Sequence, residues 1–439
     1  MTSFERFETR LPALLDDLST PRLPDYADDL FARTAATRQR PGWSFPERWL
    51  PMSAITGRFA FAPRVPWRIG VVLALLLAAA IIGLLVAGSV FSRPAPPFGP
   101  AQNGLIPYTL NGDLYVGDPK AGTSKLLVNG PDVAAFPGFA PDGTRIAFLR
   151  VVANSSPRTI NAYVMKPDGS DMRLVNPTPI DDSDAGWRQI AWTPDSRHLG
   201  IVHGVGGVNQ LDLYDVTGAA APTRIAGAAG LTWFGFRPPL GNEILFRGHM
   251  TASGTMDYGL YAMNADGTNI RQIIKANAPP SAADTFDLTD VAFTPDGSRI
   301  FFNRWTPGAD HGGTGGCCQL FVANADGTGE RQFIPNTGNA WDGKASVSPD
   351  GTNVAFLHGS NDGSTPGVAV INANGTGKIV QTGPNLSANW IWSPDSSTIL
   401  LRAQDNTLRT TYLLDPAGGP WETVAWNGDN DIDWQRLAP

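Results

Sequence analysis

Charged side chains recur at two kinds of position in residues 104–439, and their spacing could form a recognition surface. Aspartates gather in the polar stretches between repeated phrases, and basic or imidazole side chains end the second strand expected in each repeat. The candidate ligand-binding residues are Asp181, Asp184, Asp287, Asp290 and Asp431, together with Arg150, His203, Arg304 and His358. Arranged around an axis, they would form an acidic rim over a basic ring and suit a peptide, glycan or cation. Alternatively, the acidic loops are solvated and the arginines pair with them.

The longest insertion between expected strands, Arg304–Gln319, adds His311 to these candidates and holds both cysteines, Cys317 and Cys318. Outside the cytoplasm thiols tend to oxidise, so we expect either a vicinal disulfide that stiffens this loop or two free thiols. The spacing of His311 and the cysteines matches no standard zinc site. We therefore expect no metal and no cofactor.

Catalytic motifs and nucleic-acid-binding features are both weak. The chain has no G-x-S-x-G nucleophile elbow, and HGGTGG at His311–Gly316 resembles an oxyanion-hole phrase without an elbow to serve. Charged residues make up 17% of the chain and the net charge is −7, which gives nucleic-acid binding no electrostatic support. We therefore consider an enzyme less favoured than a binding protein. If the chain is an enzyme, we expect a hydrolase or lyase that acts at a channel around which the repeats are arranged.

A strand–turn–strand phrase organises the chain from residue 104 onward. It reads VAFTPDGSRIFF at Val291–Phe302 and returns as GFAPDGTRIAFLR, IAWTPDSRHLGIV, SVSPDGTNVAFL and WIWSPDSSTILL. A second phrase, such as LYAMNADGTNIRQII at Leu260–Ile274, lies between these copies. Pro, Asp and Gly in the turns serve backbone geometry. Four short strands recurring at a fixed period predict a β-propeller of antiparallel blades.

Seven second strands can be placed, which gives seven blades of about 48 residues over residues 104–439. The first unit lacks its first strand, because the repeats begin with LIPYTL after Gly104. Near the end of the chain, Ile432-Asp433-Trp434 echoes Ile190-Ala191-Trp192. We therefore expect the C-terminal strand to complete the first blade and close the ring, which would remove two open edges.

These alternating S/T-P-D-G and N-A-D-G-T phrases resemble the WD-repeat-like units of the TolB-like β-propeller family, and the resemblance covers residues 104–439. It implies an all-β propeller and leaves the function open, because proteins with the same fold can have unrelated functions. The layout with a membrane anchor resembles bacterial surface proteins, some of which are similar to transmembrane anti-sigma factors.

An uncharged apolar stretch, Ile69–Phe91, is long enough to cross a bilayer and predicts one transmembrane helix within residues 67–92. Ten arginines precede it in residues 1–68, whereas Arg93 stands alone on the other flank until Lys120. The positive-inside rule then places the N-terminus in the cytoplasm and the propeller outside. Residues 93–103 form a Pro-rich linker.

Residues 1–66 predict two short helices and a Pro- and Trp-rich arm, either a flexible tail or a docking segment for a cytoplasmic protein. The favoured function is a single-pass, membrane-anchored extracytoplasmic propeller that binds a protein, peptide or glycan. The alternative is a transmembrane signalling protein of anti-sigma-factor type, with the propeller as the outer sensor. Nucleic acid is not expected as a partner.

Overall fold

The computed structural model of the 439-residue chain contains two compact units, Met1–Val90 and Phe91–Pro439. The structure describes residues 74–77 and residues 96–438 with internal gaps. The gaps are 157, 182–188, 206–207, 219, 226–230, 253–254, 278–286, 307–316, 336–339, 361–366, 378, 382–387, 405–408 and 430–431.

The predicted membrane anchor lies largely outside the described residues. Within Ile69–Phe91 only residues 74–77 are described, and they are helical. Among the residues that the structure does describe, no helix is both long and apolar enough to cross a membrane. The helical region expected in residues 1–66 also lies outside them, so the anchor and this region stay predictions.

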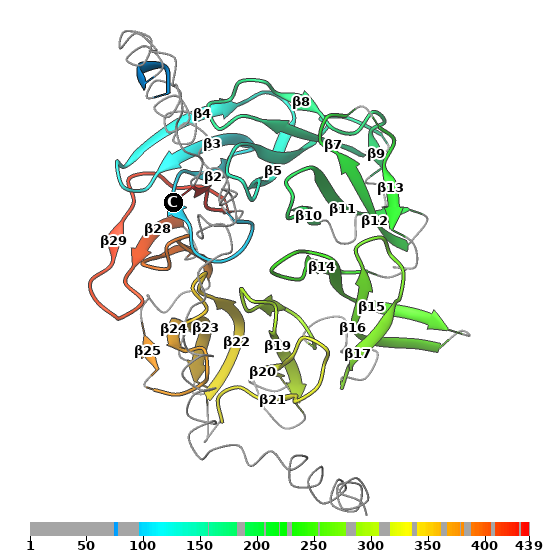
Figure 1. The fold of residues 1–439 in the computed structure, drawn as a ribbon, viewed down its shortest axis with the longest axis vertical. Helices are drawn as coiled ribbons and strands as arrows, with labels where there is room; N and C mark the ends of the chain where they lie inside the picture. Colours follow the sequence, from blue (N-terminus) through cyan, green and yellow to red (C-terminus); the bar gives the residue numbers. More distant parts are fainter. Residues whose placement is uncertain are drawn as a thin grey trace, which may run out of the picture. The chain divides into compact units, whose positions relative to one another are not determined.

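The second unit is an all-β propeller of seven antiparallel blades, as the repeats predicted. Figure 1 shows the sheets around a common centre, with β5, β10, β14 and β22 at the inner side of their blades. In chain order the strands of the blades are β2 (Ile106–Leu110), β3 (Asp113–Asp118) and β4 (Thr123–Val128); β5 (Val133–Phe139), β6 (Ile146–Val151), β7 (Thr159–Met165) and β8 (Arg173–Leu174), with β9 (Ile180–Asp181) beside β7; β10 (Gln189–Trp192), β11 (His198–Val205), β12 (Val208–Asp215) and β13 (Thr223–Ile225); β14 (Trp233–Phe236), β15 (Glu243–Ala252), β16 (Thr255–Asn264) and β17 (Arg271–Lys275); β18 (Ala292–Phe293), β19 (Arg299–Thr306), β20 (Cys317–Asn324) and β21 (Arg331–Gln332); β22 (Ala340–Val347), β23 (Asn353–Ser360), β24 (Gly367–Asn372) and β25 (Val380–Gln381); and β26 (Ala388–Trp392), β27 (Ile399–Gln404), β28 (Arg409–Leu414) and β29 (Glu422–Thr423).

The repeated Pro-Asp-Gly turns are structural, as expected. In the turn between β18 and β19, one carboxylate oxygen of Asp296 accepts the Thr294 hydroxyl at 2.6 Å and the Ser298 N–H at 3.0 Å. Gly297 adopts φ +68°, and a Cβ there would lie 1.8 Å from the Pro238 carbonyl oxygen of the preceding blade. A side chain at this position would therefore meet both backbone strain and a steric clash.

Both faces of each blade are buried, because each sheet packs between two neighbours. On β19, Phe301 packs in a cluster with Phe356 of the next blade, whereas Phe302 packs with Leu260 of the preceding blade. Phe301 and Phe302 are consecutive in sequence and both fully buried. The second strands therefore read as apolar runs and not as alternating polar and apolar residues.

The C-terminal segment closes the ring on the first blade, in agreement with the sequence. Ile432 forms an antiparallel bridge to Tyr108 on β2. Gln435 continues the contact, since its N–H donates to the Leu105 carbonyl at 2.8 Å and its carbonyl accepts the Gly104 N–H at 3.0 Å. The last strand, β30 (Arg436–Leu437), then pairs with β1 (Gln102–Asn103). This segment occupies the first-strand position of a blade that otherwise has three strands.

Replacing Trp434 tests this closure. The side chain is 4% exposed and donates its indole N–H to the Gly104 carbonyl at 3.2 Å. We expect Trp434→Ala to lower the free energy of unfolding by about 3–5 kcal/mol, through the cavity and the lost contact between segments. The matched control is Trp421→Ala, because Trp421 is 46% exposed. Its expected cost is about 1 kcal/mol or less. Equal melting temperatures for the two variants would contradict closure by this segment.

Candidate binding site in the central channel

The basic side chains at the ends of the second strands are paired within the fold. Arg150 lies 3.6 Å from the Asp132 carboxylate, and the Arg304 guanidinium lies 3.0 Å from Glu330. Arg304 also donates to the Lys275 carbonyl at 2.7 Å. Of the two readings left open by the sequence, these contacts favour pairing, although the acids involved are not those of the predicted rim.

The two described histidines among the candidates also contact carboxylates. His203 and Asp212 lie 2.9 Å apart on β11 and β12, and Arg224 joins Asp212 at 3.0 Å. Burial opposes ionisation of Asp212, but hydrogen bonds from His203 and Arg224 lower its pKa overall. His358 Nδ1 lies 2.7 Å from Asp342, and this hydrogen bond raises the pKa of His358.

The predicted acidic rim separates into different environments. Asp287 is 1% exposed, and its two oxygens accept the Asn277 and Trp305 N–H groups at 2.6 and 2.9 Å, so it connects the segment after β17 to β19. Asp290 is exposed and accepts the Asn303 amide at 2.8 Å. Asp181 lies exposed on β9.

Three other candidates lie outside the described residues. These are Asp184, His311 and Asp431. Cys317 and Cys318 begin β20 opposite Thr306 and Trp305. Their side chains are outside the described part of the structure, so the vicinal disulfide stays a prediction.

Side chains from neighbouring blades bind the inner strands on the edge that faces the channel. An inner strand has a ladder partner on one side only, so its other backbone groups need partners. The Gln189 amide both donates to and accepts from Phe234, at 2.8 and 3.0 Å. In the same way, the Asp433 carboxylate accepts the Phe139 N–H at 2.6 Å. These contacts connect adjacent blades around the channel.

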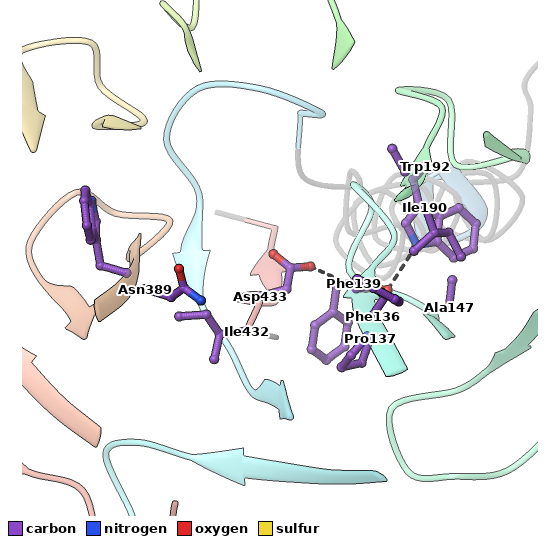
Figure 2. Close-up of a pocket in the computed structure, with 12 residues that line it drawn as sticks. Phe136, Pro137, Phe139, Ala147, Ile190, Trp192, Asn389, Ile432 and Asp433 are labelled. Atoms are coloured by element: carbon purple, nitrogen blue, oxygen red, sulfur yellow. Dashed lines mark hydrogen bonds between the residues drawn. The ribbon is translucent and has the colours of Figure 1, made fainter. Parts of the chain in front are cut away.

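A cavity of about 440 Å³ lies between the inner strands of four blades. Its lining residues are Phe136, Pro137, Gly138, Phe139 and Ala147 of the second blade, Ile190, Ala191 and Trp192 of the third, Asn389 and Trp390 of the seventh, and Ile432 and Asp433 of the closing segment. Figure 2 shows Asp433 directed toward Phe139, with Trp192 beyond it and Asn389 on the other side. The wall is mostly aromatic and aliphatic, and Asp433 is its one ionisable residue among those described.

The pKa of the Asp433 carboxyl group is strongly shifted by its surroundings. Part of the residue faces the cavity, but protein atoms surround the carboxyl group, and this desolvation raises its pKa to about 6. Backbone N–H groups of Phe139 and Trp434, and the more distant charge of Arg436, act in the opposite direction. A rise from 3.8 to about 6 corresponds to a cost of about 3 kcal/mol for the ionised form above pH 6.

A second desolvated charge lies beside the cavity on β22. Lys344 adopts φ +51° at a β-bulge and directs its ammonium group toward the Asn389 amide oxygen. The ammonium also lies 5.1 Å from the centre of the Trp390 ring. Desolvation lowers the pKa of Lys344. The Asn389 side chain, which lines the cavity, is therefore held in place by a neighbouring blade.

Asp433 belongs to the acidic stretch before the closing strand, although it was not among the candidate ligand-binding residues, and its position in the repeat gives a further signal. The strand register places it at the inner-strand position before the last aromatic or aliphatic residue. In the other six blades this position holds Gly138, Ala191, Gly235, Ala292, Ser346 and Ile391. An aspartate where six other units carry small or apolar residues marks an exception to the repeat.

Neither a known family model nor a curated protein matches this sequence. Among solved structures, the β-propeller domain of the Trilobed protease from Pyrococcus furiosus is 13% identical, with 75% of this chain and 98% of that one covered and a TM-score of 0.51. An oligogalacturonate lyase in complex with manganese is 15% identical, with 69% and 82% covered and a TM-score of 0.50. TolB from Acinetobacter baumannii is 19% identical, with 75% and 81% covered and a TM-score of 0.45.

At these identities the structural likeness shows the fold alone. The β-propeller expected from the repeats agrees with the two neighbours whose TM-scores reach 0.50. Within the described ranges, no group of three or more His, Cys, Asp or Glu side chains is placed to hold a metal ion. The channel cavity combines an aromatic wall with one desolvated carboxylate, which makes it a candidate site for binding a ligand.

Replacing Asp433 with Asn tests its ionisation. Because the folded pKa is raised, the native state binds more protons than the unfolded state between about pH 4 and 6, and stability falls as pH rises through this window. The Asn variant has no carboxyl group at this position and therefore lacks this pH-dependent loss of stability. We expect its melting temperature relative to the unmodified chain to rise between pH 4.5 and 7.5, by an amount equivalent to about 2–3 kcal/mol. A difference that does not change with pH would show that the Asp433 pKa is not raised.

Proposed function

We propose that this chain is a recognition protein, whose propeller binds a segment of a partner molecule in the cavity of its central channel. The observation that carries the proposal is the cavity itself, about 440 Å³ in volume and lined by Phe136, Trp192, Trp390 and Asp433. A concave wall of aromatic and aliphatic residues that also presents a few polar groups is typical of ligand sites. Its lining comes from four blades, so the rigid ring preorganises it.

We propose further that Ile69–Phe91 anchors the chain in a membrane, with residues 1–66 in the cytoplasm and the propeller outside. The support comes from the sequence, in which the stretch carries no charge and ten arginines precede residue 69. The proposed binding role would then belong to the extracytoplasmic side. A cytoplasmic partner for residues 1–66 would make the chain a transmembrane signalling protein.

Catalysis at the channel is the alternative class. Two neighbours in fold are named a lyase and a protease, but the likeness extends only to the fold. The described wall of the cavity offers one carboxylate, Asp433, without a second acid, a nucleophile or an imidazole beside it. General acid–base and nucleophilic mechanisms require such partnered groups. Binding is therefore the function that the cavity supports best.

Filling the cavity tests the proposed role. Gly138 lines it from β5, and a Cβ added there meets only the Asp433 Oδ2 within 4 Å, so Gly138→Phe would place a ring inside, whereas Ala221→Phe adds the same ring at an exposed position and serves as the control. The full chain in nanodiscs would be applied to an array of short peptides and oligosaccharides. We expect Gly138→Phe to weaken the selected ligands at least tenfold and Ala221→Phe to leave them unchanged. Ligands bound equally well by both variants would place the site elsewhere.

Protease accessibility tests the proposed topology. Protease added to intact spheroplasts should digest the propeller and leave a fragment that contains residues 1–66, because the arginine-rich flank stays inside. Detection with one tag at each terminus distinguishes the two products, and permeabilised spheroplasts, in which both parts are digested, serve as the control. A propeller protected until permeabilisation would reverse the orientation.

A further inference from the structure

The channel cavity carries a negative charge that the described residues do not neutralise by direct contact. No Lys, Arg or His side chain among them forms an ion pair with Asp433. Among the described residues, the charge of Arg436 acts on it from a distance, and its guanidinium donates instead to the backbone carbonyls of Pro96, at 3.1 Å, and of Gly99. An ionised carboxylate surrounded by protein is costly unless a counter-charge joins it.

Backbone capping does not by itself explain a carboxylate at this position. Asp433 accepts the Phe139 and Trp434 N–H groups at 2.6 and 2.8 Å, one on each oxygen. Elsewhere in the channel the neutral amide of Gln189 satisfies two backbone groups of Phe234. Each carboxylate oxygen has a second lone pair. The side chain therefore has acceptor capacity left for a donor that enters the cavity.

We propose that the cavity binds an organic cation, a primary ammonium or guanidinium group, with Asp433 as its counter-ion, an assignment that rests on the recognition role proposed above. The cation would come from a Lys or Arg side chain of a partner protein or from a free amine. The bound cation would supply the positive counter-charge that Asp433 lacks and would donate charge-assisted hydrogen bonds to its carboxylate. The desolvated surroundings strengthen this attraction relative to water.

The walls around Asp433 suit the rest of such a ligand. Phe136 and Trp192 line the cavity and offer apolar contact to a methylene chain. Gly138 leaves one side of the carboxylate open, because a Cβ there would lie 3.6 Å from the Asp433 Oδ2. A methyl group at this distance contacts the oxygen without displacing it.

Matched peptides test the assignment. End-blocked Ala-Lys-Ala and Ala-Arg-Ala would be titrated calorimetrically into the full chain in nanodiscs, beside Ala-Gln-Ala and the norleucine peptide, which has an uncharged chain of similar length. Butylammonium tests for a free amine. We expect the cationic peptides to bind at least tenfold more tightly than the neutral ones, and Asp433→Asn to abolish this preference. Asp168→Asn, at an exposed turn, is the control.

A gentler variant keeps the test valid if Asp433→Asn does not fold. Gly138→Ala retains the carboxylate and covers one side of it, and should weaken the cationic peptides severalfold. Equal binding of the lysine and norleucine peptides, or a charge preference that survives Asp433→Asn, would overturn the assignment. If Gly138→Phe then still removes ligands from the array, the recognition role stands and only the cation is wrong. If it does not, the recognition site itself is misplaced.

Discussion

The propeller depends on one contact between segments that are far apart in the sequence, the antiparallel bridge of Ile432 to Tyr108 and the hydrogen bonds of Gln435 that extend it. A blade buries both of its faces only when a neighbour stands on each side, and the first and seventh blades obtain theirs when the ring closes. Closure brings together Ile106, Leu400 and Trp434 in one cluster. Loss of the segment would expose these apolar side chains and an unpaired strand edge at once.

The segment that closes the ring also carries the charge that distinguishes the cavity. Ionisation of Asp433 above pH 6 lowers the stability of the closed ring, whereas a bound cation would raise that stability by linkage. Ring stability and ligand occupancy are thus coupled through one side chain. A residue retained at a cost in stability is typical of functional positions, where local structure is not optimised for folding alone.

The predicted site residues and the cavity differ for a geometric reason. The candidates Arg150, His203, Arg304 and His358 lie on second strands, one strand away from the channel wall. There they meet carboxylates of their own blades: Arg304 pairs with Glu330, just before β21, and His358 pairs with Asp342 on β22. The channel wall is formed by first strands, so the groups that reach the cavity come from those positions.

The sequence by itself determined the local elements and their number. Pro-Asp-Gly turns and apolar strands act over a few residues, so the repeats predicted seven blades, and the echo of Ile190-Ala191-Trp192 in Ile432-Asp433-Trp434 predicted how the ring closes. Only the tertiary structure decided which charges are neutralised. Both Asp287 and Asp433 belong to acidic stretches between repeats, yet Asp287 accepts the N–H groups of Asn277 and Trp305 while Asp433 lines a cavity. Desolvation and pairing depend on atoms that distant segments bring within a few ångströms, and a linear pattern does not contain those distances.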